Sequence, residues 1–170
     1  EGIYYWTTKY LFRWDPVSQK MKVWEPKSIF SASFSCNSKL YLCQQNVGLL
    51  QMSGDSPVLL PGGDKFAETT INMMIPYDDH RILLGTTTKG FYLYDGNDGA
   101  SFTPFPTGAG VDTYLAEKQL YFAARLSDGN FALATRSGGL AILDARGKFK
   151  EIMDSASGLQ DNSVWYVFQD

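Results

Sequence analysis

The sequence predicts an all-β fold: a β-propeller of about four four-stranded blades, forming either a closed ring or a fragment of a larger propeller. One short apolar segment recurs four times in the 170 residues, at intervals of 38, 42 and 49 residues. Glycine, asparagine, aspartate and proline interrupt the apolar runs every few residues, as short strands and tight turns require. Repeats of about 40–50 residues that contain only strand signals are typical of propeller blades.

The recurring segment is mostly apolar and ends in Asp or Ser; its copies are residues 10–15, 48–53, 90–95 and 139–144. We expect each copy to form strand c of a blade, counting a, b, c and d outward from the propeller axis. Strand b is expected at 3–6, 39–43, 81–84 and 131–134, and strand a at 28–34, 70–75 and 119–126. Strand d is expected at 20–24, 57–60, 101–105 and 148–152. The aspartate that ends strand c is expected to accept backbone N–H bonds within the following turn.

These strands predict a single propeller domain over residues 1–170, with repeats at approximately 1–27, 28–69, 70–118 and 119–162. Residues 163–170 then match strand a once more, and we expect them to complete the blade of residues 1–27. A closed ring and a fragment of a larger propeller both agree with this pattern. Open blade edges would favour self-association, because unpaired strand edges pair readily with other chains.

Charge, hydropathy and cysteine content limit the partners and cross-links that the chain is expected to have. The net charge of -3 gives no argument for nucleic acid. No apolar run approaches the roughly 18 residues of a membrane helix, so a membrane is expected only through a parent protein. The two cysteines, Cys36 and Cys43, are expected on adjacent strands but too far apart for a disulfide, as free and partly buried thiols.

No catalytic centre or cofactor is expected. The single histidine, His80, lies in a predicted turn, where a general base would lack a positioned partner and a pocket. The segment Asp95-Gly96-Asn97-Asp98-Gly99 faintly resembles a calcium loop, but no Glu follows at the distance that an EF-hand requires, and a plain turn is the simpler interpretation. We therefore expect no metal.

The run Gly158-Leu159-Gln160-Asp161-Asn162-Ser163-Val164 and the alternating residues up to Asp170 resemble the two-component regulator propeller repeat. Leu84-Gly85-Thr86 and Gly138-Gly139-Leu140 match later parts of that repeat, whereas the tryptophan usual in strand b is replaced in this chain. The resemblance implies a sensor module in the periplasmic or extracytoplasmic region of bacterial hybrid histidine kinases and related regulators. In several such systems the signal is an oligosaccharide, and the output enzyme would lie outside this chain.

The loops between strands b and c carry the residues most suited to a ligand. In a propeller these loops share one face around the axis with the d–a loops. The candidate ligand-binding residues are Lys9, Gln45, Asn46, Thr87, Lys89, Arg136 and Ser137. Cations, amides and hydroxyls that converge there would suit an anionic or hydroxyl-rich ligand. The alternative is ordinary solvated loop polarity.

The function expected from the sequence is ligand sensing without catalysis, by a propeller module that takes a small polar ligand or an oligosaccharide. A protein–protein interaction or dimerisation scaffold is the second possibility. A propeller lyase or glycosidase is the third, since Asp64, Asp112 and Asp161 lie on the d–a side. Fold alone does not decide among the three.

Overall fold

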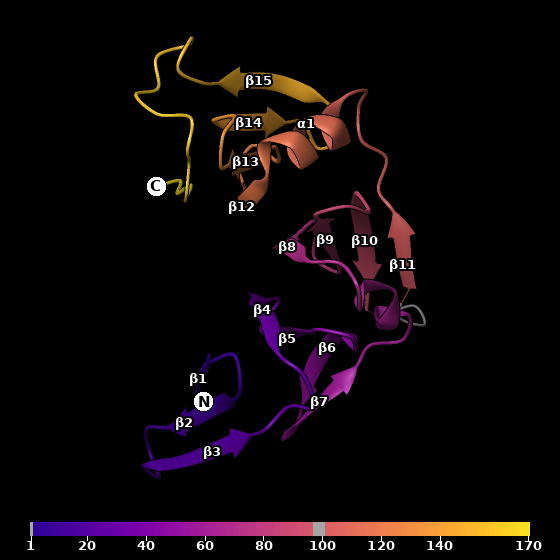
Figure 1. The fold of residues 1–170 in the computed structure, drawn as a ribbon, viewed down its shortest axis with the longest axis vertical. Coiled ribbons are helices and arrows are strands. Elements are labelled where there is room, and N and C mark those ends of the chain that lie inside the picture. Colours follow the sequence, from indigo (N-terminus) through magenta and orange to yellow (C-terminus); the bar gives the residue numbers. More distant parts are fainter. Residues whose placement is uncertain (1, 97–100) are drawn as a thin grey trace. The chain divides into compact units, whose positions relative to one another are not determined.

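The computed structural model of the chain describes residues 2–96 and 101–170 (Figure 1). The chain divides into two compact units, Glu1–Glu68 and Thr69–Asp170, and each unit holds two antiparallel sheets. Three of the sheets have four strands, and the first has three. The predicted all-β class of propeller-type blades is confirmed.

The first unit contains the sheets β1-β2-β3 and β4-β5-β6-β7, each in chain order. The strands of the first sheet are β1 (Ile3–Trp6), β2 (Leu11–Asp15) and β3 (Lys20–Trp24). Those of the second are β4 (Phe30–Cys36), β5 (Lys39–Gln44), β6 (Gly48–Ser53) and β7 (Ser56–Leu59), followed by a short 3-10 helix, η1 (Gly63–Phe66). Strand β1 therefore takes the position of strand b, and β4 that of strand a.

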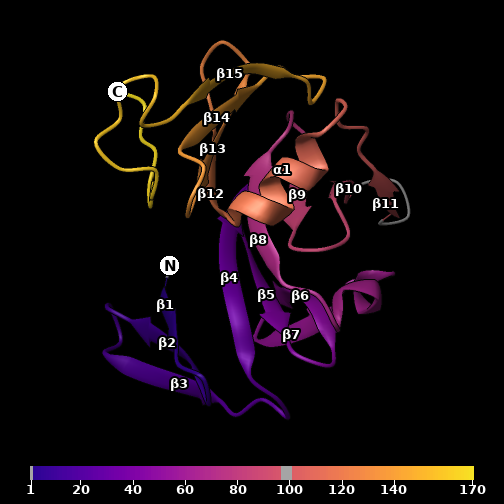
Figure 2. The ribbon, with the colours of Figure 1, turned by 45° about the horizontal axis from the view of Figure 1, so that its top comes forward.

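The second unit repeats the complete blade twice (Figure 2). Its first sheet contains β8 (Ile71–Pro76), β9 (Arg81–Thr86), β10 (Phe91–Asp95) and β11 (Ser101–Pro104). A helix, α1 (Val111–Lys118), lies in the connection to the second sheet, which contains β12 (Leu120–Arg125), β13 (Phe131–Thr135), β14 (Leu140–Leu143) and β15 (Phe149–Met153). Each strand pairs with its neighbours in the sequence, which is the predicted a-b-c-d order.

Burial explains why these segments are strands. All five residues of β13, the b strand of its blade, are buried, whereas the d strand β15 is mostly exposed. An inner strand covered on both faces favours continuous apolar residues, and an outer strand tolerates polar ones. In the first unit, Leu11, Phe30, Leu42 and Leu50 form one apolar cluster.

The turns after strand c form as predicted where the structure describes them. The Asp15 carboxylate accepts hydrogen bonds from the backbone N–H groups of Val17 and Ser18, at 2.9 and 3.2 Å. Asp144 does the same for Arg146 and Lys148, at 2.9 Å each. These bonds hold the pKa of both carboxyls below the usual range. The turn at 95–99 lies partly outside the described residues, so its prediction stays untested.

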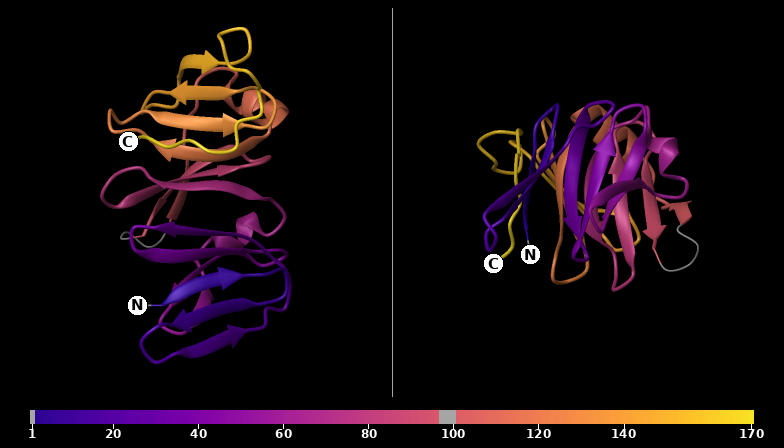
Figure 3. Two further views of the ribbon diagram at one scale, coloured as in Figure 1. Left: turned by 90° about the vertical axis from the view of Figure 1, so that its left-hand side faces the viewer. Right: turned by 90° about the horizontal axis from the view of Figure 1, so that it is seen from below.

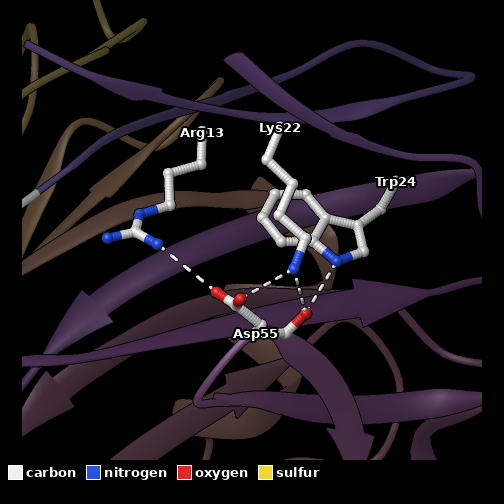
Figure 4. A network of polar contacts seen from close by, with 4 residues as sticks. All are labelled: Arg13, Lys22, Trp24 and Asp55. Atoms are coloured by element: carbon white, nitrogen blue, oxygen red, sulfur yellow. Dashed lines mark hydrogen bonds and ion pairs between the residues drawn. The ribbon is translucent and has the colours of Figure 1, made fainter. Parts of the chain in front are cut away.

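Within the first unit, an aspartate in the turn after β6 joins the two sheets (Figure 4). The Asp55 carboxylate pairs with Arg13 at 3.3 Å and with Lys22 at 2.9 Å, while its backbone carbonyl accepts the Trp24 indole N–H at 2.9 Å. Hydrogen bonding and charge from Lys22, with a smaller effect of Arg13, lower the pKa of the Asp55 carboxyl. The Asp55 side chain is 63% exposed, so these ion pairs orient the strands more than they stabilise them.

Both cysteines are free, as predicted, and both are buried rather than partly buried. Cys36 lies opposite Lys39 across β4 and β5, and Cys43 lies opposite Ala32. Burial raises the pKa of the Cys36 thiol to about 11 and that of Cys43 to about 12. Both thiols are therefore protonated at neutral pH and react slowly, because the thiolate is the nucleophilic form.

The segment 163–170 carries no strand assignment, although it lies beside β12 (Figure 3). The Val164 N–H donates to the Thr135 carbonyl at 2.9 Å, and the Gln169 side chain exchanges two hydrogen bonds with Ser127, at 2.7 and 3.0 Å. The segment thus follows an a strand without joining its sheet. Its predicted role in the blade of residues 1–27 stays a prediction.

Candidate functional site

The b–c loops of the second unit are held by a threonine at the end of strand b. The Thr135 hydroxyl donates to the Gly139 carbonyl and accepts the Gly138 N–H, both at 2.9 Å, and the side chain is fully buried. Thr86 makes the same pair of bonds, to the Gly90 carbonyl at 2.8 Å and from the Lys89 N–H at 2.9 Å. The loop backbone is therefore fixed from within, while Thr87, Thr88, Lys89, Arg136 and Ser137 are exposed.

The first unit follows the same design with local differences. Thr7, which is exposed, accepts the N–H groups of Lys9 and Tyr10 at 3.3 and 3.1 Å. Gln44 occupies the threonine position in the next blade, and its buried side-chain amide donates to the Ser28 carbonyl at 3.2 Å. Longer bonds in solvent hold the Thr7 loop less firmly than the buried bonds hold the loops of the second unit.

In each blade that has all four strands, a second contact joins the b–c loop to the start of strand a. The residue after the threonine or glutamine donates its backbone N–H to the carbonyl just before strand a. The pairs are Gln45 to Ile29 at 2.9 Å, Thr87 to Thr70 at 2.9 Å and Arg136 to Gln119 at 3.0 Å. These three residues, which the sequence analysis chose for their polarity, thus occupy one equivalent position in three blades.

Helix α1 positions the fourth blade's loop, and the sequence analysis missed it. The Tyr114 hydroxyl donates to the Gly138 carbonyl at 2.6 Å, and the Lys118 carbonyl accepts the Arg136 and Ser137 N–H groups. Only two residues of the helix, Val111 and Leu115, are buried. An eight-residue helix with so small an apolar face gives almost no periodic signal, so the sequence pattern does not predict it.

Arg136 lies against two aromatic rings that are not among the candidate residues predicted from the sequence. Its guanidinium carbon is 5.2 Å from the Tyr121 ring centre and 6.0 Å from that of Trp165. The two rings meet edge to face with 4.8 Å between centres. Tyr121 is 40% exposed and Trp165 58% exposed, and in the described part of the chain no carboxylate pairs with Arg136. A cation held over ring faces keeps its in-plane N–H groups available for a ligand.

The neighbouring blade offers hydroxyls and an amide at the corresponding place. The Thr87 hydroxyl accepts the Asn72 side-chain N–H at 3.2 Å, and Thr88 shares a 3.0 Å hydrogen bond with Thr69. Strands β8 and β12, which lead into these two sites, contact each other. The second unit thus carries a polar cluster on one blade and an aromatic–cationic cluster on the next.

All seven predicted ligand-binding residues are exposed. Lys9, Gln45 and Asn46 belong to the first unit, and the other four, Thr87, Lys89, Arg136 and Ser137, belong to the second. No feature of the structure tests them as a ligand site, and they stay a prediction.

The first unit contains a cavity that the sequence analysis did not anticipate. It has a volume of about 540 Å³ and is lined by residues that include Trp24, Phe30, Gln44, Val47 and Leu50. Cavities that bind small molecules typically measure about 300–1,000 Å³ and combine apolar walls with a few polar groups. Val47 directly follows the predicted ligand residue Asn46, so a b–c loop also borders this hollow.

The residues considered for catalysis have local structural partners. His80 is exposed in the turn between β8 and β9, where its backbone N–H donates to the Asp78 carboxylate at 3.0 Å. Asp112 accepts the Thr107 hydroxyl at 2.8 Å, and Asp161 accepts the Ser163 N–H at 2.7 Å. Among the described residues, no group of three His, Cys, Asp or Glu side chains is placed to hold a metal ion.

These sheets define an all-β class of antiparallel propeller-type blades, three with four strands and one with three, whose b–c loops present polar side chains. No family model and no curated protein sequence matches the chain. No helix in the described part of the chain has the length and hydropathy to cross a membrane.

Solved structures share the fold. The extracellular domain of the candidate hybrid two-component system BT4673 from B. thetaiotaomicron matches 99% of the chain, with a TM-score of 0.70 and 14% identity. That of BT3049 from the same organism also matches 99%, with a TM-score of 0.64 and 22% identity. PorZ, a surface component of the type-IX secretion system of Porphyromonas gingivalis, matches 90%, with a TM-score of 0.56 and 14% identity. The chain spans 22%, 23% and 25% of the BT3049, BT4673 and PorZ chains. The fold implied by the two-component regulator resemblance is therefore confirmed.

Proposed function

We propose that this chain is a non-catalytic ligand-sensing module, in the extracytoplasmic region of a bacterial signal-transduction protein. Two of the structures that share its fold are extracellular domains of candidate hybrid two-component systems. The module binds its ligand, and any output enzyme belongs to another part of the parent protein. The same likeness supports a periplasmic or other extracytoplasmic location.

The observation that carries the proposal is the contrast within each b–c loop of the second unit. The backbone is fixed by a buried threonine, while Thr87, Lys89, Arg136 and Ser137 remain exposed. A rigid loop with exposed polar side chains is suited to recognition, because little ordering entropy is lost when a ligand binds. Positive charge in this otherwise acidic chain favours a polar, anionic or hydroxyl-rich ligand.

The test compares two double variants of the whole chain by titration calorimetry against a panel of neutral and acidic oligosaccharides. Lys89→Ala with Arg136→Ala removes two cations from the b–c loops. Arg146→Ala with Lys150→Ala removes the same two residue types from the turn and strand on the opposite side of strand c in the fourth blade. We expect the first variant alone to lose binding. Equal binding by both variants would reject the b–c loops as the site.

A protein-interaction role is the second candidate, because Trp165, Tyr166 and Phe168 are 58%, 67% and 77% exposed. Exposed large apolar side chains in one segment favour contact with another protein surface. Light scattering separates the two: a concentration-dependent assembly that the Tyr166→Ser and Phe168→Ser exchanges abolish supports the scaffold. A monomer at all concentrations supports the sensor.

A further inference from the structure

The a strand of each complete blade carries a β-bulge at its second residue. The pairing register shifts between Phe30 and Ala32, between Ile71 and Met73, and between Leu120 and Phe122. The extra residues are Ser31, Asn72 and Tyr121. A bulge leaves one residue without a partner in the ladder and redirects its side chain, and bulges are frequent beside functional sites. Three bulges at one repeat position indicate a property of the blade and not an accident of one strand.

In both blades of the second unit, the bulged side chain meets the first residue of the b–c loop. The Asn72 amide donates to the Thr87 hydroxyl at 3.2 Å, and the Tyr121 ring lies under the Arg136 guanidinium at 5.2 Å. Thr87 and Arg136 are equivalent, because each follows the threonine that fixes its loop. The bulge and the loop therefore deliver one pair of side chains per blade to the same end of strand a.

Trp165 extends this arrangement. Val164-Trp165-Tyr166 runs beside β12 with Trp165 against Tyr121 and Tyr166 against Phe122, at 4.8 and 4.4 Å between ring centres. The segment thus places Trp165 at the level of the bulge residue Tyr121. While the bulge position varies from serine and asparagine to tyrosine, the flanking Phe30, Ile71 and Leu120 are always apolar and buried. The varied position is thus not dictated by the core.

We propose that the bulge residue and the first b–c loop residue form the specificity pair in both blades of the second unit. We further propose that the Tyr121–Arg136–Trp165 cluster binds a sugar ring that carries a carboxylate or a sulfate. The inference rests on the proposed sensing function and names the ligand class of that site.

The chemistry of the cluster selects such a ligand. The Arg136 guanidinium has planar N–H donors that match the two oxygens of a carboxylate or sulfate. The exposed side chains of Trp165 and Tyr121 provide apolar surface for the C–H face of a sugar ring, and aromatic side chains supply such surface at low entropic cost. The Asn72–Thr87 pair adds an amide and a hydroxyl for the hydroxyls of an adjoining sugar. A purely neutral sugar would leave the cation without a partner.

The test uses three trisaccharides of one sugar series: trigalacturonate, a sulfated galactan trisaccharide and neutral galactotriose. Titration calorimetry on the whole chain measures each affinity for the parent, for Arg136→Gln, for Trp165→Ala and for the control Arg146→Gln. We expect at least one acidic probe to bind at least about ten-fold more tightly than galactotriose. Arg136→Gln and Trp165→Ala should each weaken it at least about ten-fold, and the control should not change it. If both acidic probes bind, the site recognises negative charge in general. If only one binds, the site recognises the shape of that particular anionic group, carboxylate or sulfate.

Two outcomes would overturn the inference in different ways. If galactotriose binds as well as the acidic probes and Arg136→Gln changes nothing, the ligand class is wrong while sensing stands. If none of the three binds and the wider oligosaccharide panel also fails, both the ligand class and the proposed function are wrong. Circular dichroism of each variant confirms that loss of binding is not loss of fold.

Discussion

The buried threonine that fixes the fourth blade's b–c loop allows a quantitative test. Replacing Thr135 by valine keeps the shape of the side chain but removes its hydroxyl. The Gly138 N–H then loses its acceptor in a buried loop, whereas the Gly139 carbonyl keeps the Thr135 backbone N–H at 3.0 Å. One buried donor without a partner costs about 1–3 kcal/mol, so we expect Thr135→Val to lower the free energy of unfolding by about 2 kcal/mol.

The matched control is Thr7→Val, which removes an equivalent hydroxyl at an exposed site with longer bonds, 3.1 and 3.3 Å. Water replaces those bonds, so the expected loss is below about 0.5 kcal/mol. Urea unfolding gives both values, and hydrogen exchange of peptides covering β13 and β14 localises the effect. Equal losses for the two variants would refute the view that burial, and not the hydrogen bonds alone, makes Thr135 important.

Three further predictions follow from local geometry. Gly139 has a φ of 80°, and a Cβ there would collide with the Met153 carbonyl, so Gly139→Ala should destabilise by roughly 2–4 kcal/mol in urea unfolding; a loss below 1 kcal/mol would contradict this. The pKa of about 12 at Cys43 should keep folded protein slow to react with iodoacetamide at pH 8, and labelling as fast as in urea would contradict it. Burial raises the pKa of Asp78, but hydrogen bonds from Arg81 outweigh it and hold the value at about 2. The Asp78 carboxylate contributes fully to the free energy of unfolding above the ordinary pKa of about 4, and this contribution is lost as the pH falls toward 2. Asp78→Asn should therefore make the free energy of unfolding depend less on pH in that window; an unchanged pH profile would refute this.

The sequence was sufficient for the blades because their strands are short, apolar and separated by turn residues at a fixed repeat. The strands b and c were placed within about two residues, since these inner strands carry the strongest apolar pattern. Helix α1 was not predicted because only Val111 and Leu115 are buried in it, and the glycines that precede it are typical of a loop. The segment 163–170 had the pattern of strand a but carries no strand assignment, because sequence pattern does not show whether a strand finds a neighbour.

The loop residues of the candidate site were found by polarity, but their aromatic partners were not. Tyr121 and Trp165 lie in alternating apolar runs, where packing is the expected role of an aromatic side chain. A signal was nevertheless present. The second residue of strand a is Ser31, Asn72 or Tyr121 in successive repeats, and Trp165 occupies the matching sequence position in the segment 163–170, while the neighbouring residues stay apolar. A position that changes polarity inside a regular repeat is not determined by the core, and such positions are the ones to examine for function.

The structure also separates the parts that stabilise a loop from the parts that would select a ligand. Thr135 and the Gln119 carbonyl hold the backbone around Arg136, whereas the Arg136 guanidinium lies over the exposed rings of Tyr121 and Trp165. Exposed substitutions away from buried networks change stability by about 0.5 kcal/mol or less, so Arg136→Gln should leave the unfolding free energy almost unchanged. Different side chains can therefore occupy the bulge and loop positions of a blade without loss of its fold. This is how one repeat can carry a polar pair at Asn72–Thr87 and an aromatic–cationic pair at Tyr121–Arg136.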